Sequence, residues 1–518
     1  MMLERRRQAT AGPRDTPHAP GSGVLGGVLV AGAAVLAGAC LAALAAQAAR
    51  GMFASDECFY AAISEWLLVR HSVPAVIPEF YSGLYYFHPP LLHVAGALWA
   101  ALFGLRALHE LPVAVTGLTL AAVLIGPARS VPATARALAV LLCLVNDSIL
   151  RYAVRFYVEC LITLLFAAAV ALLLKFRRTG RTRVAVALGL VAGLAPLTKL
   201  TGWLLVAAIA ALALVHAIRR EGRLARGLAL AVAVAVALAG PWLVRNQVLF
   251  GSPLYPAFAP DLDGALYALN RQKFSIPWLD FMRGVPAAIG LPVGAMTVLA
   301  LARALVTRRW TLREGLLVLG VLGAFGTAFM PMAQARHLEP FVPVLALTAS
   351  WSVAEALDRR PWLVLGVGAA LAVWVLVRLP GLPDYRAGAD LPGYLSETFE
   401  AIGSRMPAQA TILSPWTYDT YYYTHRRATW PNPWGQRVKP VDLFYDRDPD
   451  GFARDLDRYG IDYMLVPTMV RMEAFNSTNY PESFVTCVRA LVARGDLKVA
   501  WQSPRMALVE NARRVPRP

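Results

Sequence analysis

Long apolar segments alternate with short polar loops from about residue 24 to residue 382. The first runs from about Val24 to Ala49, and several later ones contain about 18 or more apolar residues without a charge, enough to cross a bilayer as a helix. Hydropathy predicts about eleven transmembrane helices. Their approximate spans are 24–49, 107–127, 133–150, 156–175, 183–197, 200–217, 225–245, 285–306, 314–331, 337–357 and 361–379. A shorter apolar stretch, Leu91–Gly104, is either a juxtamembrane helix or a twelfth span.

The charges of the loops predict the orientation of these helices. Arginine gathers in alternate loops, which the positive-inside rule places in the cytoplasm. These loops are 129–136, 175–183, 219–226, 308–313 and 358–360. The first apolar segment is longer than the core of a signal peptide, so we expect a retained helix preceded by a cytoplasmic tail, residues 1–23. The remaining loops, including that of Asp56, then lie outside.

The composition changes at about residue 383, where charged and aromatic residues and proline return. The pattern of polar and apolar residues over 452–459 predicts a helix that ends at Gly460. Residues 461–466, 499–502 and 506–509 are predicted to be strands. Residues 383–518 are therefore predicted to form an extracytoplasmic α/β domain. After eleven helices this domain lies on the same side as Asp56. Residues 24–382 form the transmembrane domain.

Composition narrows the class further. The chain has 518 residues, 57% hydrophobic, and a formal net charge of +17. Soluble proteins are rarely so apolar. Because the basic residues cluster in short loops, they are read as topology signals, and we expect no nucleic-acid partner. The five cysteines show no metal-ligand spacing, and a Cys58–Cys487 disulfide is left open.

Two motifs near the first predicted outer loop carry candidate chemistry. Asp56 and Glu57 follow the first apolar segment, and such a pair could act as general base or metal ligand. The alternative is an N-cap for the helix that follows. His88-Pro89-Pro90 comes next, and its two prolines would hold His88 rigidly. Its alternative is a plain helix entry with an interfacial histidine.

Further ionisable residues lie at the predicted outer ends of helices. Arg155 and Glu159 share one helix face, so they could simply pair, but Glu159 begins a membrane span, where an ionisable group usually faces a polar cavity. Four other residues are cations at the predicted outer ends of helices, the side of the membrane where the positive-inside rule disfavours positive charge. Snorkelling to the interface explains any one of them, but four together suggest a shared anion, with phosphate the obvious choice. They are Lys199, Arg245, Arg336 and His337.

In their order, these motifs resemble the GT-C superfamily of glycosyltransferases that use polyprenyl-phosphate sugars. That superfamily includes protein O-mannosyltransferases and the aminoarabinose transferases that modify lipid A. The resemblance covers about residues 50–345. It is carried by Asp56-Glu57, Tyr86-Phe87-His88-Pro89-Pro90-Leu91, Leu102-Phe103-Gly104, Arg155-Phe156-Tyr157-Val158-Glu159, Leu197-Thr198-Lys199, Pro241-Trp242-Leu243-Val244-Arg245-Asn246 with Gly251-Ser252-Pro253-Leu254-Tyr255-Pro256, and Arg336-His337-Leu338-Glu339-Pro340.

The chain also departs from the family pattern. Cys58 and Phe59 follow Asp-Glu where members often have Arg or another polar residue, and some relatives carry Asp in place of Glu159. His-Pro-Pro looks more like the mannosyltransferase branch, but Leu91-Leu92 replaces the Gly-Lys that often follows there. These differences leave the sugar and the acceptor open.

The resemblance implies an inverting transferase that moves a monosaccharide from a polyprenyl-phosphate donor to an acceptor hydroxyl at the outer membrane face. The acceptor is a lipid, glycan or protein. Ala- and Arg-rich composition points to a bacterium, hence the inner membrane with the site facing the periplasm. Asp56 would be the general base, and Glu57 and His88 would position the donor or hold a divalent metal ion, if one is used. The donor phosphate would meet Lys199, Arg245, Arg336 and, less directly, Arg155; Glu159, Tyr60, His88 and His337 would bind substrate or serve the structure.

Two further alternatives remain open. A transporter or flippase for a lipid-linked anion would also need buried charges, although the sequence shows no inverted repeat and such a protein needs no large outer domain. The second concerns the aromatic segment 416–434, which could contact carbohydrate, form a core strip or rest on the membrane interface. Our hypothesis is that the C-terminal domain governs the acceptor and not the chemistry.

Overall fold

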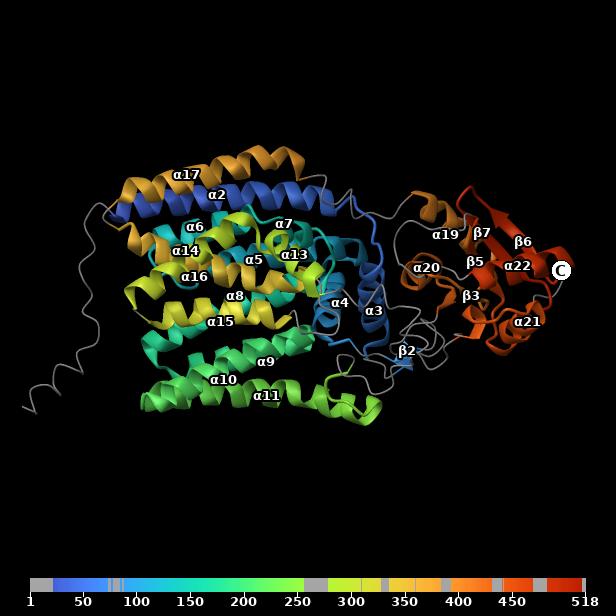
Figure 1. Ribbon diagram of the computed structural model, residues 1–518, viewed down its shortest axis with the longest axis horizontal. Coiled ribbons are helices and arrows are strands. Elements are labelled where there is room, and N and C mark those ends of the chain that lie inside the picture. Colours follow the sequence, from blue (N-terminus) through green and yellow to red (C-terminus); the bar gives the residue numbers. More distant parts are fainter. Residues whose placement is uncertain are drawn as a thin grey trace, which may run out of the picture.

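The chain forms a bundle of long helices with a smaller sheet-containing domain at one end (Figure 1). The computed structural model describes residues 22–72, 76–77, 84–85, 88–255, 278–308, 310–327, 335–358, 360–382, 393–430, 440, 442–468 and 482–514. The expected cytoplasmic tail, apart from its last two residues, lies outside these ranges. So do Tyr86, Phe87 and much of the predicted outer loop between residues 241 and 283.

Each of the eleven predicted segments is occupied by a helix or by a bent pair of helices. They are α2 (Ser22–Ala48), α5 (Leu111–Ile125), α6 (Ala133–Leu144) with α7 (Asp147–Ala153), α8 (Val158–Thr179), α9 (Thr182–Thr198), α10 (Trp203–Ile218), α11 (Gly222–Phe250), α13 (Trp278–Ile289) with α14 (Leu291–Thr307), α15 (Leu312–Gly326), α16 (Val342–Ala356) and α17 (Pro361–Arg378). The periodicity of the apolar segments thus locates the helices well.

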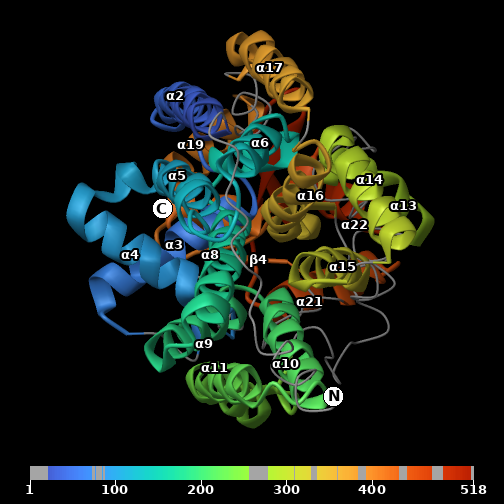
Figure 2. The same ribbon diagram turned by 90° about the vertical axis from the view of Figure 1, so that its left-hand side faces the viewer.

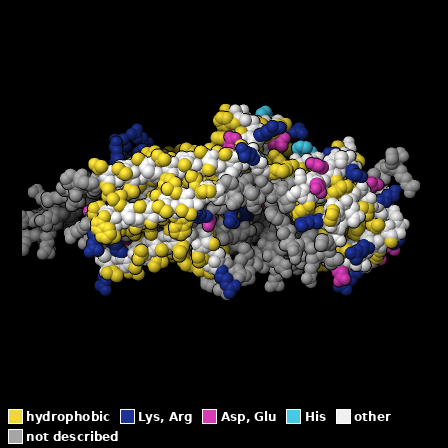
Figure 3. All heavy atoms as spheres, turned by 90° about the horizontal axis from the view of Figure 1, so that it is seen from above, with side chains coloured by type: hydrophobic (Ala, Val, Ile, Leu, Met, Phe, Trp, Pro, Cys, Tyr) yellow, Lys and Arg dark blue, Asp and Glu magenta, His cyan; other side chains and the backbone are white. Residues whose placement is uncertain are grey.

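The number of membrane spans is a separate question. Within the described residues, five helices are long and apolar enough to cross a bilayer, or up to seven if each bent pair is one span. The bends are 68° between α6 and α7 and 94° within the second pair. The remaining four helices have 15 or 17 residues, which is short for a full span. The count of eleven or twelve spans therefore stays a prediction, while the apolar surface over the bundle is plain in Figure 3.

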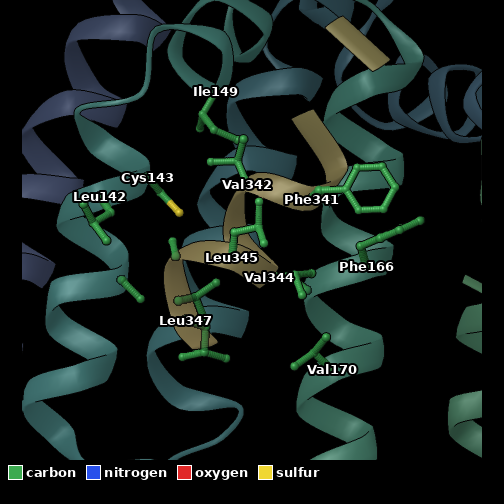
Figure 4. Packing of buried hydrophobic residues seen from close by; sticks show 14 of the residues in the cluster. Leu142, Cys143, Ile149, Phe166, Val170, Phe341, Val342, Val344, Leu345 and Leu347 are labelled. Carbon is green, nitrogen blue, oxygen red and sulfur yellow. The ribbon is translucent and has the colours of Figure 1, made fainter. Parts of the chain in front are cut away.

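The middle of the bundle is a continuous apolar core. Seen along its axis, α6, α8 and α16 lie toward the middle, with α2 and α17 at one edge and α10 and α11 at the opposite one (Figure 2). Residues 342–350 of α16 are all buried, as expected for a helix that is apolar on every face. Phe341 meets Phe166 of α8 edge to face at 5.3 Å, and Val342 and Leu345 point into the same cluster (Figure 4).

Helices α9 and α11 approach each other closely through small residues. A Cβ atom on Gly189 would lie 2.5 Å from the carbonyl oxygen of Ala231, and one on Gly193 would lie 2.9 Å from the Cα of Ala235. Small residues four apart on facing helices allow such backbone contact, which stabilises helix pairs in membranes.

We expect Gly193→Leu to lower the stability of the bundle by about 1–3 kcal/mol, the usual cost of overpacking. The larger side chain would force α9 away from α11. Thermal unfolding in detergent measures the effect. Gly32→Leu is the matched control, because a Cβ there meets nothing within 4 Å; equal stability of the two variants would contradict the close packing.

Helices α3 (Asp56–Arg70) and α4 (Leu91–Phe103) run across the end of the bundle that faces the C-terminal domain (Figure 1). They pack tightly, since a Cβ on Gly96 of α4 would lie 2.4 Å from the hydroxyl of Ser64 on α3. A short two-stranded sheet, β1 (Val76–Ile77) with β2 (Leu84–Tyr85), lies between them in sequence. The orientation of α4 favours the juxtamembrane interpretation of Leu91–Gly104 over a twelfth span.

The C-terminal domain, described from residue 393 onward, is built on a five-stranded mixed sheet of order β4-β3-β5-β7-β6. Strand β3 is parallel to β4 and β5, and β7 is antiparallel to β5 and β6. The elements are α19 (Gly393–Arg405), β3 (Thr411–Leu413), α20 (Thr417–Thr424), β4 (Arg427–Thr429), α21 (Pro449–Arg458), β5 (Tyr463–Pro467), α22 (Glu482–Arg494), β6 (Leu497–Gln502) and β7 (Met506–Asn511).

The predicted helix before Gly460 and the three predicted strands are confirmed as α21, β5, β6 and β7. Strands β3 and β4 were not predicted, because each has only three residues. The suggested Cys58–Cys487 disulfide is wrong: Cys58 lies in α3 and Cys487 in α22, and both are buried cysteines that are not disulfide-bonded.

The arrangement of the helices leads to a specific prediction of membrane topology. The α8–α9 turn at Arg181 and the end of α17 at Arg378 lie at opposite ends of the bundle (Figure 1). Because the arginine-rich loops should be cytoplasmic, we expect a periplasm-dependent reporter fused after Arg378 to be active and one fused at Arg181 to be inactive. The reverse pattern would place Asp56 on the cytoplasmic face.

Candidate active site

Four charged side chains form a connected network where α3 and the bundle meet. The guanidinium of Arg336 donates from Nη2 to Oδ2 of Asp56 at 3.3 Å, and its Nε lies 3.3 Å from Oε1 of Glu159. Nζ of Lys199 donates to the same Glu159 oxygen at 2.6 Å. One buried carboxylate thus orients two cations, one of which also holds Asp56.

The network joins four elements that are distant in sequence. Asp56 is the first residue of α3, and Glu159 lies in the first turn of α8. Lys199 follows the last residue of α9, and Arg336 belongs to the 3₁₀ helix η4 (Ala335–Phe341). Side-chain exposure falls from 34% at Asp56 to 1% at Glu159. Asp56 is therefore open to solvent, whereas Glu159 is an internal counter-ion of the two cations.

Tyr157 forms an aromatic platform under two of the arginines. The guanidinium carbon of Arg155 lies 4.6 Å from the ring centroid, and that of Arg336 lies 5.1 Å from it. Arg155 also donates to the Tyr157 hydroxyl at 3.3 Å. Cation–π contacts of this kind hold guanidinium groups in place. Tyr157 stands within the Arg155–Glu159 motif, but its sequence position alone predicted no role for it.

Glu57 does not share the open position of Asp56. Its side chain is completely buried, and it accepts from the backbone N–H of Phe156 at 2.8 Å and that of Ala54 at 3.4 Å. Arg155 pairs with it at 3.4 Å. Its carboxylate thus ties the start of α3 to the segment leading into α8, and a catalytic role for Glu57 stays a prediction.

The two predicted metal ligands, Glu57 and His88, have different described neighbours. Glu57 is turned toward Phe156 and Arg155, whereas the ring of His88 packs 4.7 Å from Phe59 and 5.8 Å from Tyr60, centroid to centroid. Within the described ranges, no group of three or more His, Cys, Asp or Glu side chains is arranged to hold a metal ion. The Glu57–His88 metal site therefore stays a prediction.

The remaining predicted residues divide into two groups. Tyr60 and His337 are buried beside the network, and Nδ1 of His337 has no hydrogen-bond partner among the described residues. Arg245 lies apart on α11, stacked 4.4 Å from the ring of Trp242 and donating to Asn246 at 3.2 Å. Its described contacts are with its own helix, so a direct role at the shared anion stays a prediction for Arg245.

The aromatic segment of the C-terminal domain is mostly a packing element. Trp416 and Trp430 are buried in that domain's cores. Tyr418, Tyr421, Tyr422 and Tyr423 of α20 instead pack against the apolar cluster of α3. The core interpretation thus fits the two tryptophans, and the tyrosines form the contact between the C-terminal domain and the helix that carries Asp56.

Asp419, also on α20, lies directly beside the start of α3. Its Oδ1 accepts from the backbone N–H of Ser55 at 2.7 Å and from the thiol of Cys58 at 3.6 Å. Burial raises the pKa of the Asp419 carboxyl to about 6, against the opposing effect of the hydrogen bond from Ser55. A pKa near 6 favours the ionised form of Asp419 at neutral pH. The sequence analysis did not single it out.

The fold is a bundle of apolar helices with a C-terminal α/β domain at the end that carries the ionic network, and solved glycosyltransferase structures share this fold. The sequence matches no protein-family profile and no curated protein. ArnT from Cupriavidus metallidurans, solved bound to undecaprenyl phosphate, is similar in structure with a TM-score of 0.64 at 17% identity, over 93% of this chain and 99% of ArnT.

A second similar structure comes from an archaeon. The oligosaccharyltransferase AglB from Archaeoglobus fulgidus, in complex with an inhibitory peptide and a dolichol-phosphate, gives a TM-score of 0.63 at 14% identity. The match covers 86% of this chain and 71% of AglB. The predicted resemblance to GT-C glycosyltransferases is thus confirmed at the level of the fold, which together with the apolar helices indicates a multi-pass membrane protein.

Proposed function

We propose that this protein is an inverting glycosyltransferase that moves a monosaccharide from a polyprenyl-phosphate donor to an acceptor hydroxyl at the periplasmic face of a bacterial inner membrane. One observation carries the proposal. A partly exposed carboxylate, Asp56, lies 3.3 Å from Arg336, which shares the buried Glu159 with Lys199. Asp56 would serve as the base for the acceptor hydroxyl, and the neighbouring cations Arg336 and Lys199 would bind the donor phosphate.

An apolar hollow inside the helical bundle supports a lipid donor. It lies between α8, α10, α15 and the start of α16, and Phe166, Val170, Leu205, Phe341 and Val344 are among its lining residues. Phe341 ends the same 3₁₀ helix that carries Arg336, and α10 follows shortly after Lys199. A chain of isoprene units could therefore lie in the bundle while its phosphate meets Arg336 and Lys199.

The chemistry follows from these positions. Asp56 would take the proton of the acceptor hydroxyl as its oxygen attacks the anomeric carbon. The bond from that carbon to the phosphate oxygen breaks on the opposite face of the sugar, so the configuration inverts. The departing polyprenyl phosphate gains negative charge, and preorganised cations stabilise that charge in the transition state. Arg336 and Lys199 fill this role, with Glu159 fixing their positions.

The ion pair between Asp56 and Arg336 suits a resting state without donor. While Arg336 binds Asp56, the carboxylate is a weaker base, because a nearby positive charge favours its ionised form. A donor phosphate that draws Arg336 toward itself would raise the basicity of Asp56. Binding of the donor would then prepare the base for the acceptor.

A second hollow, between α3 and α20, offers a place for the acceptor. Trp66, Arg70 and Glu65 line it from α3, and Tyr421 and His425 from the C-terminal domain. Aromatic faces beside charged side chains suit a sugar chain. Glu65 is nine residues from Asp56 on the same helix, roughly 14 Å along its axis, so an acceptor bound there would need several units to reach the base.

The test is reconstitution of the purified protein in lipid vesicles with a panel of synthetic polyprenyl-phosphate sugars. We expect release of free polyprenyl phosphate together with sugar transfer for at least one donor. Mass spectrometry of envelope glycans from a deletion strain supplies the acceptor to be added. If no donor is consumed in the presence of extracts from that strain, the proposed activity is wrong.

A further inference from the structure

The residue before Asp56 adopts a backbone conformation that serine rarely takes. Ser55 has φ 59° and ψ −126°, and the N–H of Glu57 donates to the carbonyl oxygen of Ala54 at 3.3 Å. These values describe a tight turn over Ala54–Glu57 with Ser55 at its first central position, as in a type II′ turn. Glycine is usual there, because a Cβ is crowded at positive φ.

Such a conformation persists only where its surroundings hold it. Here the C-terminal domain does so. The Asp419 carboxylate accepts the Ser55 N–H at 2.7 Å, across 364 residues of sequence. Two residues earlier, the hydroxyl of Tyr423 donates to the Phe53 carbonyl oxygen at 2.6 Å. Both side chains lie on α20, and both are hydrogen-bonded to the backbone that leads into α3.

We propose that Asp419 is a positioning residue: from the C-terminal domain, it holds the Ser55 turn and so fixes the place of the Asp56 carboxylate beside Arg336. This rests on the proposed function of Asp56 as the base. It also revises our hypothesis that the C-terminal domain governs the acceptor alone, because the docked domain completes the catalytic end of α3.

The charge of Asp419 suits this role. A carboxylate near the N-terminus of a helix is stabilised by the helix dipole, and a hydrogen bond from a backbone N–H to an ionised acceptor is stronger than one to a neutral acceptor. Asp419 is 2% exposed, so water does not compete for the bond. Asp419→Asn keeps an oxygen that can accept this hydrogen bond, whereas Asp419→Ala leaves no acceptor.

The first experiment compares Asp419→Ala and Asp419→Asn in the full-length protein. We expect kcat to fall about tenfold or more for Ala, in keeping with the loss of a buried bond to a charged group, with KM for the donor changed by less than about threefold. Asn should restore most of kcat. Asp462→Ala is the matched control, since Asp462 accepts the Thr411 N–H at 2.9 Å within the domain; its kcat should stay near wild type.

The second experiment uses the turn itself. If Asp419 serves to hold Ser55, then glycine at position 55, which adopts positive φ without crowding, should reduce the dependence on Asp419. We expect Asp419→Ala to lower kcat by less than about threefold in a Ser55→Gly background. Equal losses in both backgrounds would overturn the proposal, because a double-mutant cycle then shows no coupling between the two residues.

A third measurement does not depend on sugar transfer. Hydrogen exchange of the Ser55 amide should be slow in the wild type, fast in Asp419→Ala and intermediate or slow in Asp419→Asn. A protein that transfers no sugar but shows this pattern would refute the proposed activity and keep the positioning contact. Unchanged exchange at Ser55 in both variants would overturn the role of Asp419, whatever the activity.

Discussion

Asp56→Asn should reduce the rate of sugar transfer by about 10²-fold or more, in line with the usual contribution of a general base. The amide has the shape of the carboxylate and can still accept the bond from Arg336 at 3.3 Å, but it cannot take a proton at neutral pH. Binding of the donor lipid should therefore persist. The measurement is single-turnover transfer from a saturating donor, with lipid binding measured separately.

A matched control for this substitution exists at the same end of the bundle. Asp147 begins α7 in the way that Asp56 begins α3, is 52% exposed and pairs with Arg378. Asp147→Asn should leave transfer near the wild-type rate. If purified Asp56→Asn also transfers sugar at that rate, Asp56 is only part of the helix N-terminus and another base must serve.

The helices were predictable because their signal is local. Each apolar segment contains its own periodicity and ends at arginine, proline or glycine, so α2, α8 and α11 could be located within a few residues. Their number as membrane spans stays a prediction, because α5, α9, α15 and α16 have only 15 or 17 residues, at or below the lower limit of a full span. Packing among neighbours, and not hydropathy, decides where such helices sit.

The site was only partly predictable, and the division has a physical reason. Asp56, Glu159, Lys199 and Arg336 stood out because ionisable groups at the ends of apolar helices are costly unless they pair, and the structure brings all four together. The same argument also selected Glu57, whose carboxylate is buried against backbone donors. Adjacent carboxylates in a sequence do not reveal which of them is buried and which is exposed.

Asp419 and Tyr157 escaped the sequence analysis for different reasons. Asp419 lies in a segment with several acidic and aromatic residues, and its partner Ser55 is 364 positions away, so no local pattern connects them. A weak signal did exist for Tyr157, as an aromatic residue two positions after Arg155 in a motif with Glu159. The sequence could not show that the Tyr157 ring contacts two guanidinium groups, because Arg336 reaches that ring from η4, which is distant in sequence.

Removing the cations should weaken the binding of polyprenyl phosphate itself, without any sugar. We expect Lys199→Ala and Arg336→Ala each to raise the Kd by about 10- to 100-fold, because a hydrogen bond to a charged group contributes about 1.5–3 kcal/mol. Titration of the lipid into the purified protein measures this. Arg378→Ala is the control, since Arg378 is an arginine at the same end of the bundle that pairs with Asp147.

The variant Arg245→Ala tests on which side of the site the donor phosphate lies. If Arg245 also meets the phosphate, as the sequence predicts, Arg245→Ala should raise the Kd by a similar factor. A change of less than about threefold would place the phosphate on the Glu159 side of the site. A loss at Arg245 as large as that at Arg336 would move the phosphate toward α11. Unchanged affinity in both Lys199→Ala and Arg336→Ala would leave these cations as counter-ions of Glu159, and the donor phosphate would have to bind elsewhere.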